Sequence, residues 1–224
     1  MALATWWYED GWGQAPLPSA MTVESANGGF ALAEATGLPI RVVDQRISEG
    51  HRPYLALLNG EPAAYGWVAT RSATIGELAL SFRIPAGNRY LWDFATLPAF
   101  RGRGLYPSLL AEIARRECPP ATRLWIIHAP ENLPSGIGIT RAGFASVAEL
   151  SFDSGGRPAL KSLGNNHRAA AAAELIGLPL LDGELDPCWK CGGCSCEHAG
   201  DTGRSCSCAT TPAVSPPASS QNAG

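Results

Sequence analysis

The sequence predicts an α/β (α+β) fold, in which a single mixed, mostly antiparallel sheet with flanking helices is followed by a small cysteine-rich C-terminal tail. Strand-like apolar segments joined by turn residues fill the first half of the chain, and a glycine-rich turn then opens an amphipathic helix. Six of the seven cysteines lie between positions 188 and 208. A chain of 224 residues that is 46% hydrophobic can bury one core and carry a small appendage.

The first fifty residues are expected to be an aromatic-rich lead-in and helices that join the sheet domain. Residues 1–22 hold four large aromatic side chains without a clear period, so their packing stays open: Trp6, Trp7, Tyr8 and Trp12. Small and apolar residues over 24–37 predict a helix, although Gly28 and Gly29 each cost it about 1 kcal/mol. A second short helix is predicted over 40–48.

An antiparallel meander is predicted next. Residues 54–58 and 63–70 have strand composition and flank an Asn-Gly dipeptide, which favours a tight hairpin turn. Residues 75–84 and 90–97 form a second strand-like pair, joined by a Pro-Ala-Gly-Asn turn.

The pattern changes after Pro98, where strands and helices begin to alternate. The run Arg-Gly-Arg-Gly at 101–104 is followed by leucine, isoleucine and alanine at helical spacing, and two prolines at 119–120 end this helix. The rest of the core, which we place at residues 51–153, is a strand at 123–128, a helix at 133–142 and a strand at 145–152.

The chain beyond the core becomes polar and low in complexity. Residues 154–187 are expected to form a linker with a short alanine-rich helix at 167–176, and residues 209–224 a disordered tail. Residues 188–208, between them, contain the C-x-x-C spacing that lets two thiolates reach one metal ion through a tight turn.

This cysteine-rich segment is expected to bind a metal, with zinc as the first candidate. The six predicted ligands are Cys188, Cys191, Cys194, Cys196, Cys206 and Cys208. One zinc site takes only four ligands, so an iron–sulfur centre, a shared-thiolate cluster and a thiol-rich tail without metal stay open as alternatives.

Charge and hydropathy exclude some partners. A net charge of −3 and a pI near 5.8 provide no general field for nucleic-acid phosphates or anionic lipid, so neither nucleic acid nor membrane is expected as a partner. The first ten residues lack the basic start of a secretory signal, and no apolar run reaches the roughly 20 residues that span a bilayer. We therefore expect a cytoplasmic protein.

The glycine-rich turn predicts an anion site, because the start of a helix presents free backbone N–H groups and the positive end of the helix dipole. Residues 94–105 (FATLPAFRGRGL) closely resemble the signature of the GNAT acetyltransferases. Asn132, followed eleven residues later by Gly143-Phe144, is similar to the second motif of that family. The resemblance covers about residues 50–153.

The resemblance implies an acyl-CoA-dependent N-acyltransferase, with acetyl-CoA as the donor and an amine of a small molecule or peptide as the acceptor. Transfer would occur by direct attack in a ternary complex. Main-chain groups at 95–97 would pair with the pantetheine arm, and the amides of 101–106 would hold the pyrophosphate. The implied cofactor-binding residues are Ala95, Thr96, Leu97, Arg101, Gly102, Arg103, Gly104, Leu105, Tyr106 and Asn132. Asn132 would equally suit a helix N-cap.

Two positions depart from the family pattern. Tyr106 stands where the family usually has glycine or alanine, and Ile139 stands where it often has the tyrosine that protonates the leaving thiolate. The candidates for the general base are His128, whose imidazole titrates near neutral pH, and Asp93, with Glu77 a weaker one. The missing tyrosine keeps a non-catalytic acyl-CoA sensor open, and the cysteine-rich segment keeps open a metal-handling protein that uses the α/β domain as a scaffold.

Overall fold

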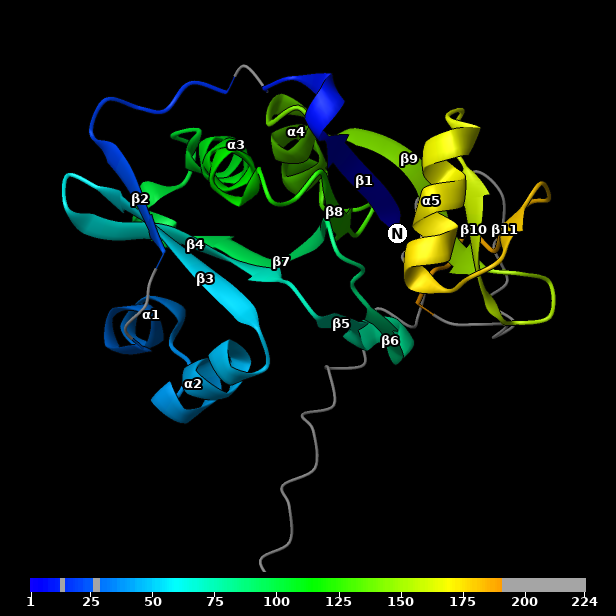
Figure 1. Ribbon diagram of the computed structural model, residues 1–224, viewed down its shortest axis with the longest axis horizontal. Coiled ribbons are helices and arrows are strands. Elements are labelled where there is room, and N and C mark those ends of the chain that lie inside the picture. The colour runs from blue at the N-terminus through cyan, green and yellow to red at the C-terminus, as the bar shows by residue number, and fades with distance from the viewer. Residues whose placement is uncertain (13–14, 26–28, 191–224) are drawn as a thin grey trace, which may run out of the picture.

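The computed structural model of the chain describes residues 1–12, 15–25 and 29–190. Five of the six predicted metal ligands and the predicted disordered tail at 209–224 lie outside these residues. Within the described part, nine strands form one mixed sheet in the order β11-β10-β9-β1-β8-β7-β4-β3-β2 (Figure 1). Its neighbouring strands are antiparallel except for two parallel pairs, β7–β8 and β10–β11. A mixed, mostly antiparallel sheet is thereby confirmed.

The strands of this sheet are β1 Ala2–Trp7, β2 Met21–Ser25, β3 His51–Leu58, β4 Glu61–Ala69, β7 Asn88–Thr96, β8 Arg123–His128, β9 Ala145–Phe152, β10 Pro158–Ser162 and β11 Leu180–Leu181. A separate hairpin is made of β5 Ser72–Ile75 and β6 Leu80–Arg83. The helices are α1 Gly29–Thr36, α2 Ile40–Ser48, α3 Leu105–Glu117, α4 Leu133–Arg141 and α5 Asn166–Ile176.

Most of the predicted core elements are present. The structure gives α2, β8 and β9 the predicted bounds, and the apolar side of α3 is buried as its spacing indicated. Asn59 and Gly60 both have positive φ, 53° and 83°, which is the geometry that makes an Asn-Gly pair a tight hairpin turn. Local sequence signals were therefore sufficient wherever an element has one buried face or a strong turn.

The N-terminal lead-in differs from its expectation, because residues 2–7 form a strand in the middle of the sheet. β1 lies between β8 and β9 and pairs antiparallel with both (Figure 1). Trp6 packs into the core under α3, whereas Trp7 packs into the core on the other face, beside α5. A strand buried on both faces shows no polar and apolar alternation, which explains why these residues have no visible period.

Three further segments differ from the predicted elements. The single helix expected over 24–37 is instead the end of β2 followed by the shorter α1. The single strand expected over 75–84 is instead the end of β5, a turn with Ala79 at φ 49°, and β6. The expected linker contains its predicted alanine-rich helix as α5, but it also adds the strands β10 and β11 to the same sheet, which therefore continues past residue 153.

The helices and the hairpin cover the two faces of the sheet. One core, containing Leu91, Leu109 and Ile126, lies under α3 and α4, and a second core, containing Trp125 and Leu160, lies between the sheet, α5 and the β5–β6 hairpin. The helices α1 and α2 lie below β3 and β4 in Figure 1, on the side opposite α3. None of the helices in the described residues is long and apolar enough to cross a membrane.

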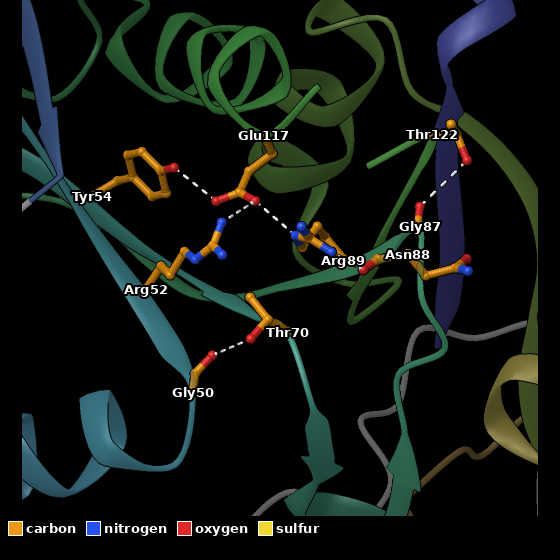
Figure 2. Close-up of polar contacts among 9 residues, drawn as sticks. All are labelled: Gly50, Arg52, Tyr54, Thr70, Gly87, Asn88, Arg89, Glu117 and Thr122. Atoms are coloured by element: carbon orange, nitrogen blue, oxygen red, sulfur yellow. Dashed lines mark hydrogen bonds and ion pairs between the residues drawn. The ribbon is translucent and has the colours of Figure 1, made fainter. Parts of the chain in front are cut away.

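A buried ionic network fixes the C-terminal end of α3 against the sheet (Figure 2). The side chain of Glu117 is fully buried, and its carboxylate accepts hydrogen bonds from Arg89 Nε at 2.7 Å, Arg52 Nη1 at 2.9 Å and the Tyr54 hydroxyl at 2.8 Å. A buried carboxylate needs partners of this kind to offset its lost hydration. The network holds α3 on β3 and β7, and so sets where the N-terminus of this helix points.

Candidate functional site

The principal cleft opens where β7 and β8 separate. Their parallel pairing runs from Asn88 with Arg123 to Leu91 with Ile126 and goes no further along the described strands. Beyond that point a cleft of about 840 Å³ lies between β7, β8, the loop before α3, the first turn of α3, and α4. Clefts of this size hold small molecules and cofactors.

A bulge in β7 accompanies the separation. On the side of β4, Trp92 pairs with Trp67 and Ala95 pairs with Tyr65, so two β7 residues stand opposite the single residue Gly66. Asp93, one of these two, has a φ of 50°. The ring of the other, Phe94, occupies the space beside Gly66, since a Cβ on Gly66 would lie 2.1 Å from Phe94 Cε1.

The loop before α3 has the geometry of a phosphate cradle. Gly102 and Gly104 have φ of 75° and 73°, a region that glycine enters without strain. No acceptor among the described residues takes the backbone N–H groups from Gly102 to Tyr106. Free amides at the positive end of a 13-residue helix suit an anion, and both Arg101 and Arg103 line the same end of the cleft.

Tyr106 closes the cleft between α3 and α4. A Cβ on Gly138 would lie 2.4 Å from Tyr106 Cδ1, so the ring lies directly on the glycine of α4. Its hydroxyl is 3.3 Å from Ser135 Oγ, and burial raises the pKa of the phenol to about 12, although the hydrogen bond with Ser135 lowers it. The phenol is therefore neutral at physiological pH and points along the cleft wall.

Asn132 both lines the cleft and begins α4. Its Oδ1 accepts a hydrogen bond from the backbone N–H of Ser135 at 3.2 Å, which confirms the N-cap. The side-chain NH₂ group has no partner among the described residues, so the cap leaves two donors for a ligand.

The two predicted catalytic residues both line the cleft, in different surroundings. His128 Nδ1 is 3.0 Å from the backbone carbonyl of Ala129, and the ring packs against Gly136 of α4. With Nδ1–H donating to that carbonyl, Nε2 would be the basic nitrogen. Asp93 forms an ion pair with Arg46 at 2.6 Å, which gives its carboxylate a structural partner.

The guanidinium of Arg46 also lies over two indole rings, 5.0 Å from the centroid of Trp67 and 4.6 Å from that of Trp92. Trp92 lines the principal cleft and a smaller cavity of about 310 Å³ between α2 and the β5–β6 hairpin. Glu77, in the turn between β5 and β6, also lines the principal cleft. The cleft therefore extends past the bulge of β7 to the side of the sheet that carries the β5–β6 hairpin.

The structure brings nine of the ten predicted cofactor residues to this cleft. Leu97 is the exception, because its N–H donates to Ala63 and its carbonyl accepts from Phe100. Ser135 and Gly138 were missed, although the large residue at 106 was a signal that a small residue must face it. Whether these residues bind a cofactor stays a prediction.

The metal prediction concerns mainly residues outside the described chain. In the described part, no group of three or more His, Cys, Asp or Glu side chains could hold a metal ion. Cys188 is buried with 8% of its surface exposed. Cys118 lies far along the chain from this segment, and burial together with the charge of Glu117 raises the pKa of its thiol to about 11.

Comparisons with known proteins gave distant similarities only. Neither a scan against protein-family models nor a search of curated proteins found a match. Among solved structures, a GCN5-related N-acetyltransferase from Kribbella flavida is 15% identical, with 65% of this chain and 53% of that chain covered and a TM-score of 0.42. This chain thus spans about half the length of that protein.

Two other solved structures are covered over more of their length. The ribosomal-protein alanine N-acetyltransferase from Escherichia coli is 15% identical, with 60% of this chain and 83% of that chain covered and a TM-score of 0.46. The aminoglycoside N-acetyltransferase AAC(6')-Iy, bound to a CoA bisubstrate analogue, is 18% identical, with 57% and 92% covered and a TM-score of 0.45. All three are N-acetyltransferases, the class that the motifs at 94–105 and 132–144 resemble.

Proposed function

We propose that this protein is an acyl-CoA-dependent N-acyltransferase that uses acetyl-CoA and an amine acceptor. One observation carries the proposal: the cleft between the separating strands β7 and β8 ends at a loop of free backbone amides before α3. Such a cradle suits a pyrophosphate, and the open edge of β7 suits a ligand that carries amide groups. Coenzyme A has both chemical features in one extended molecule.

The donor would lie along the α3 and α4 side of the cleft. Amides from Gly102 to Tyr106 would hold the pyrophosphate, and Arg101 and Arg103 would add charge. Ala95 and Thr96 would offer main-chain groups to the pantetheine arm, while Asn132 would use its free NH₂ group. Leu97 would have no direct contact, because its main-chain groups are already bonded within the chain.

The acceptor would approach from the face that carries α2 and the β5–β6 hairpin. Trp92, Asp93 and Glu77 line the cleft on the strand and hairpin side, so an amine would meet an aromatic wall and carboxylates there. Acidic groups favour an ammonium on approach, and the amine must then lose a proton before it can attack. An amine of a small molecule or peptide fits this arrangement.

Starting from the ammonium, transfer removes two protons from the nitrogen, one before the attack and one after it, and returns one to the thiolate. The amine nitrogen attacks the thioester carbonyl, the carbon–sulfur bond breaks, and the thiolate takes up a proton as it leaves. His128 Nε2 would accept the proton of the amine, directly or through a water. Ile139 is buried with 1% exposed and has no proton to donate, so the neutral phenol of Tyr106, which lines the cleft, would return a proton to the thiolate, directly or through solvent.

The test is release of free CoA thiol from acetyl-CoA by the full chain, measured against a panel of primary amines, with acetyl-CoA affinity measured separately by calorimetry. Micromolar binding with amine-dependent thiol release would support the enzyme. Binding without thiol release for any amine would instead support a sensor, the alternative that Ile139 favours. Absence of binding would reject both.

A further inference from the structure

Two cavities meet at one indole ring. The principal cleft has a volume of about 840 Å³, and the smaller cavity between α2 and the β5–β6 hairpin has one of about 310 Å³. Of the described residues that line these two spaces, Trp92 alone is common to both. The smaller cavity is at the lower end of the sizes that hold small molecules. Trp92 is therefore the wall between the proposed acyltransferase cleft and a second space of ligand size.

The backbone fixes where this ring lies. Trp92 pairs with Trp67 of β4 and is the last β7 residue paired before the bulge. Residues directly opposite each other on antiparallel strands share a face of the sheet, and Trp67 packs with Leu32 of α1 and Val43 of α2. Trp92 packs against this cluster and also against the core that includes Phe82 of the hairpin. Its side chain thus lies between the helices α1 and α2 and the hairpin.

Neighbouring side chains hold the indole in this place. The guanidinium of Arg46 lies over the ring, 4.6 Å from its centroid, and is itself fixed by the ion pair with Asp93 at 2.6 Å. The His51 ring has its centroid 5.0 Å away with the two planes at 64°, and the Trp67 ring has its centroid 6.2 Å away. The indole cannot swing aside without breaking these contacts, so the wall is rigid.

The indole N–H adds a further indication. Trp92 Nε1 is buried and has no hydrogen-bond partner among the described residues. A buried N–H without an acceptor destabilises a fold, and a phenylalanine ring would avoid this cost. Stability alone therefore does not explain a tryptophan at this position, and its size at the cleft wall does.

We propose that Trp92 is the specificity-determining residue of the acceptor site, and that its indole limits the acceptor to small aliphatic amines. This inference rests on the proposed function. The donor takes the α3 and α4 side of the cleft, which leaves the acceptor the space beside Asp93 and Glu77 that Trp92 bounds. An amine with a bulky ring next to its amino group would need the smaller cavity as well, and the indole closes that cavity to the cleft.

Removal of the ring tests the proposal, because it joins the two cavities. Trp92→Ala should admit bulky amines, and Trp92→Phe, which keeps a smaller ring, should lie between Trp92→Ala and wild type. Val42→Ala is the matched control, since Val42 lines the smaller cavity but not the principal cleft, and its truncation enlarges that cavity behind an intact wall. If Trp92→Ala does not fold by circular dichroism, Trp92→Leu takes its place.

The experiment uses the full chain, acetyl-CoA and three primary amines of rising size: propylamine, benzylamine and 1-naphthylmethylamine. The readouts are kcat/KM for thiol release with each amine and the Kd of each amine by calorimetry with CoA bound. In wild type, kcat/KM for naphthylmethylamine should be at least about tenfold below that for propylamine. Trp92→Ala should raise the ratio of these two values at least about tenfold, and Val42→Ala should leave it within about twofold of wild type.

Several results would overturn the size limit. These are the same size profile in wild type and Trp92→Ala, a wild type that takes naphthylmethylamine as readily as propylamine, and an equal shift in Val42→Ala, which would assign the effect to cavity volume. If no amine gives thiol release, the proposed function fails, and the Kd values of the three amines, measured without CoA if CoA does not bind, still decide the size limit. Absence of amine binding in every variant overturns it too.

Discussion

The Tyr106 ring occupies the place of a side chain at position 138, where a Cβ would lie 2.4 Å from Tyr106 Cδ1. A large residue on α3 is thus matched by a glycine on α4, and the pair sets the width of the cleft between these helices. Tyr106 is partly buried, with a neutral phenol next to Ser135.

This size match predicts that Gly138→Val is destabilising, by about 1–3 kcal/mol, because the added methyl groups collide with the ring. The free energy of unfolding should be measured in urea for Gly138→Val, Tyr106→Ala and the double variant. The double variant should recover part of the loss, since the smaller side chain on α3 makes room. Strictly additive losses would show that the two residues do not compete for one space.

The glycine-rich loop predicts a second outcome. Gly104→Ala should weaken acetyl-CoA binding about tenfold or more, because φ of 73° strains any residue with a Cβ and the loop amides would turn away from the phosphates. Gly60→Ala provides the control, since Gly60 has a similar φ of 83° in a hairpin turn that does not line the cleft. Equal affinity in wild type and Gly104→Ala, measured by calorimetry, would remove this loop from the binding site.

The third prediction separates the two candidate bases. With an active acceptor in hand, His128→Ala should lower kcat/KM and change its pH profile, because the general base would be lost, while CoA affinity stays within about twofold. Asp93→Asn keeps a residue that tolerates positive φ and removes the ion pair with Arg46. A flattened profile in Asp93→Asn but not in His128→Ala would move the role to Asp93.

A fourth prediction concerns His51. Its side chain is 11% exposed, and the centroid of its ring lies 5.0 Å from that of the Trp92 ring. Burial is the main reason that the pKa of His51 lies below its usual 6.5. The charge of Glu49 raises this pKa and the charge of Arg46 lowers it, so that the net direction is downward. As pH falls through 6.5, the unfolded chain takes up the proton first, so the free energy of unfolding should fall until pH drops below the folded pKa. His51→Phe should lack this component in urea titrations at pH 5 to 8, and an unchanged pH dependence would assign it to other groups.

The fifth prediction concerns the ionic network of α3. Glu117→Gln leaves Arg89, which is 9% exposed, without its buried counter-charge, and should cost about 3–5 kcal/mol of unfolding free energy. Glu112→Gln on the same helix removes pairs with Arg115 and Arg116, both partly exposed, and should cost under about 1 kcal/mol. Similar losses for the two variants, measured by urea unfolding, would show that Glu117 is not the anchor of α3.

The sequence alone determined the features that depend on neighbouring residues. The glycines at 102 and 104, the helix face that follows them and the Asn-Gly hairpin are local signals, and each has the expected geometry. The motif residues at 101–106 and Asn132 meet at one cleft, because short strand–turn–helix connections bring them to the same edge of the sheet. Local chemistry was enough to find the cleft, apart from Leu97.

Only the tertiary structure decided which residues meet across the chain. β1 lies between β8 and β9, and burial on both faces removes the alternation that would have marked it as a strand. The pairing of Asp93 with Arg46, the match of Tyr106 with Gly138 and the attachment of Trp189 to Glu131 all join residues more than 30 positions apart. No local pattern encodes such contacts, because they depend on how the elements pack.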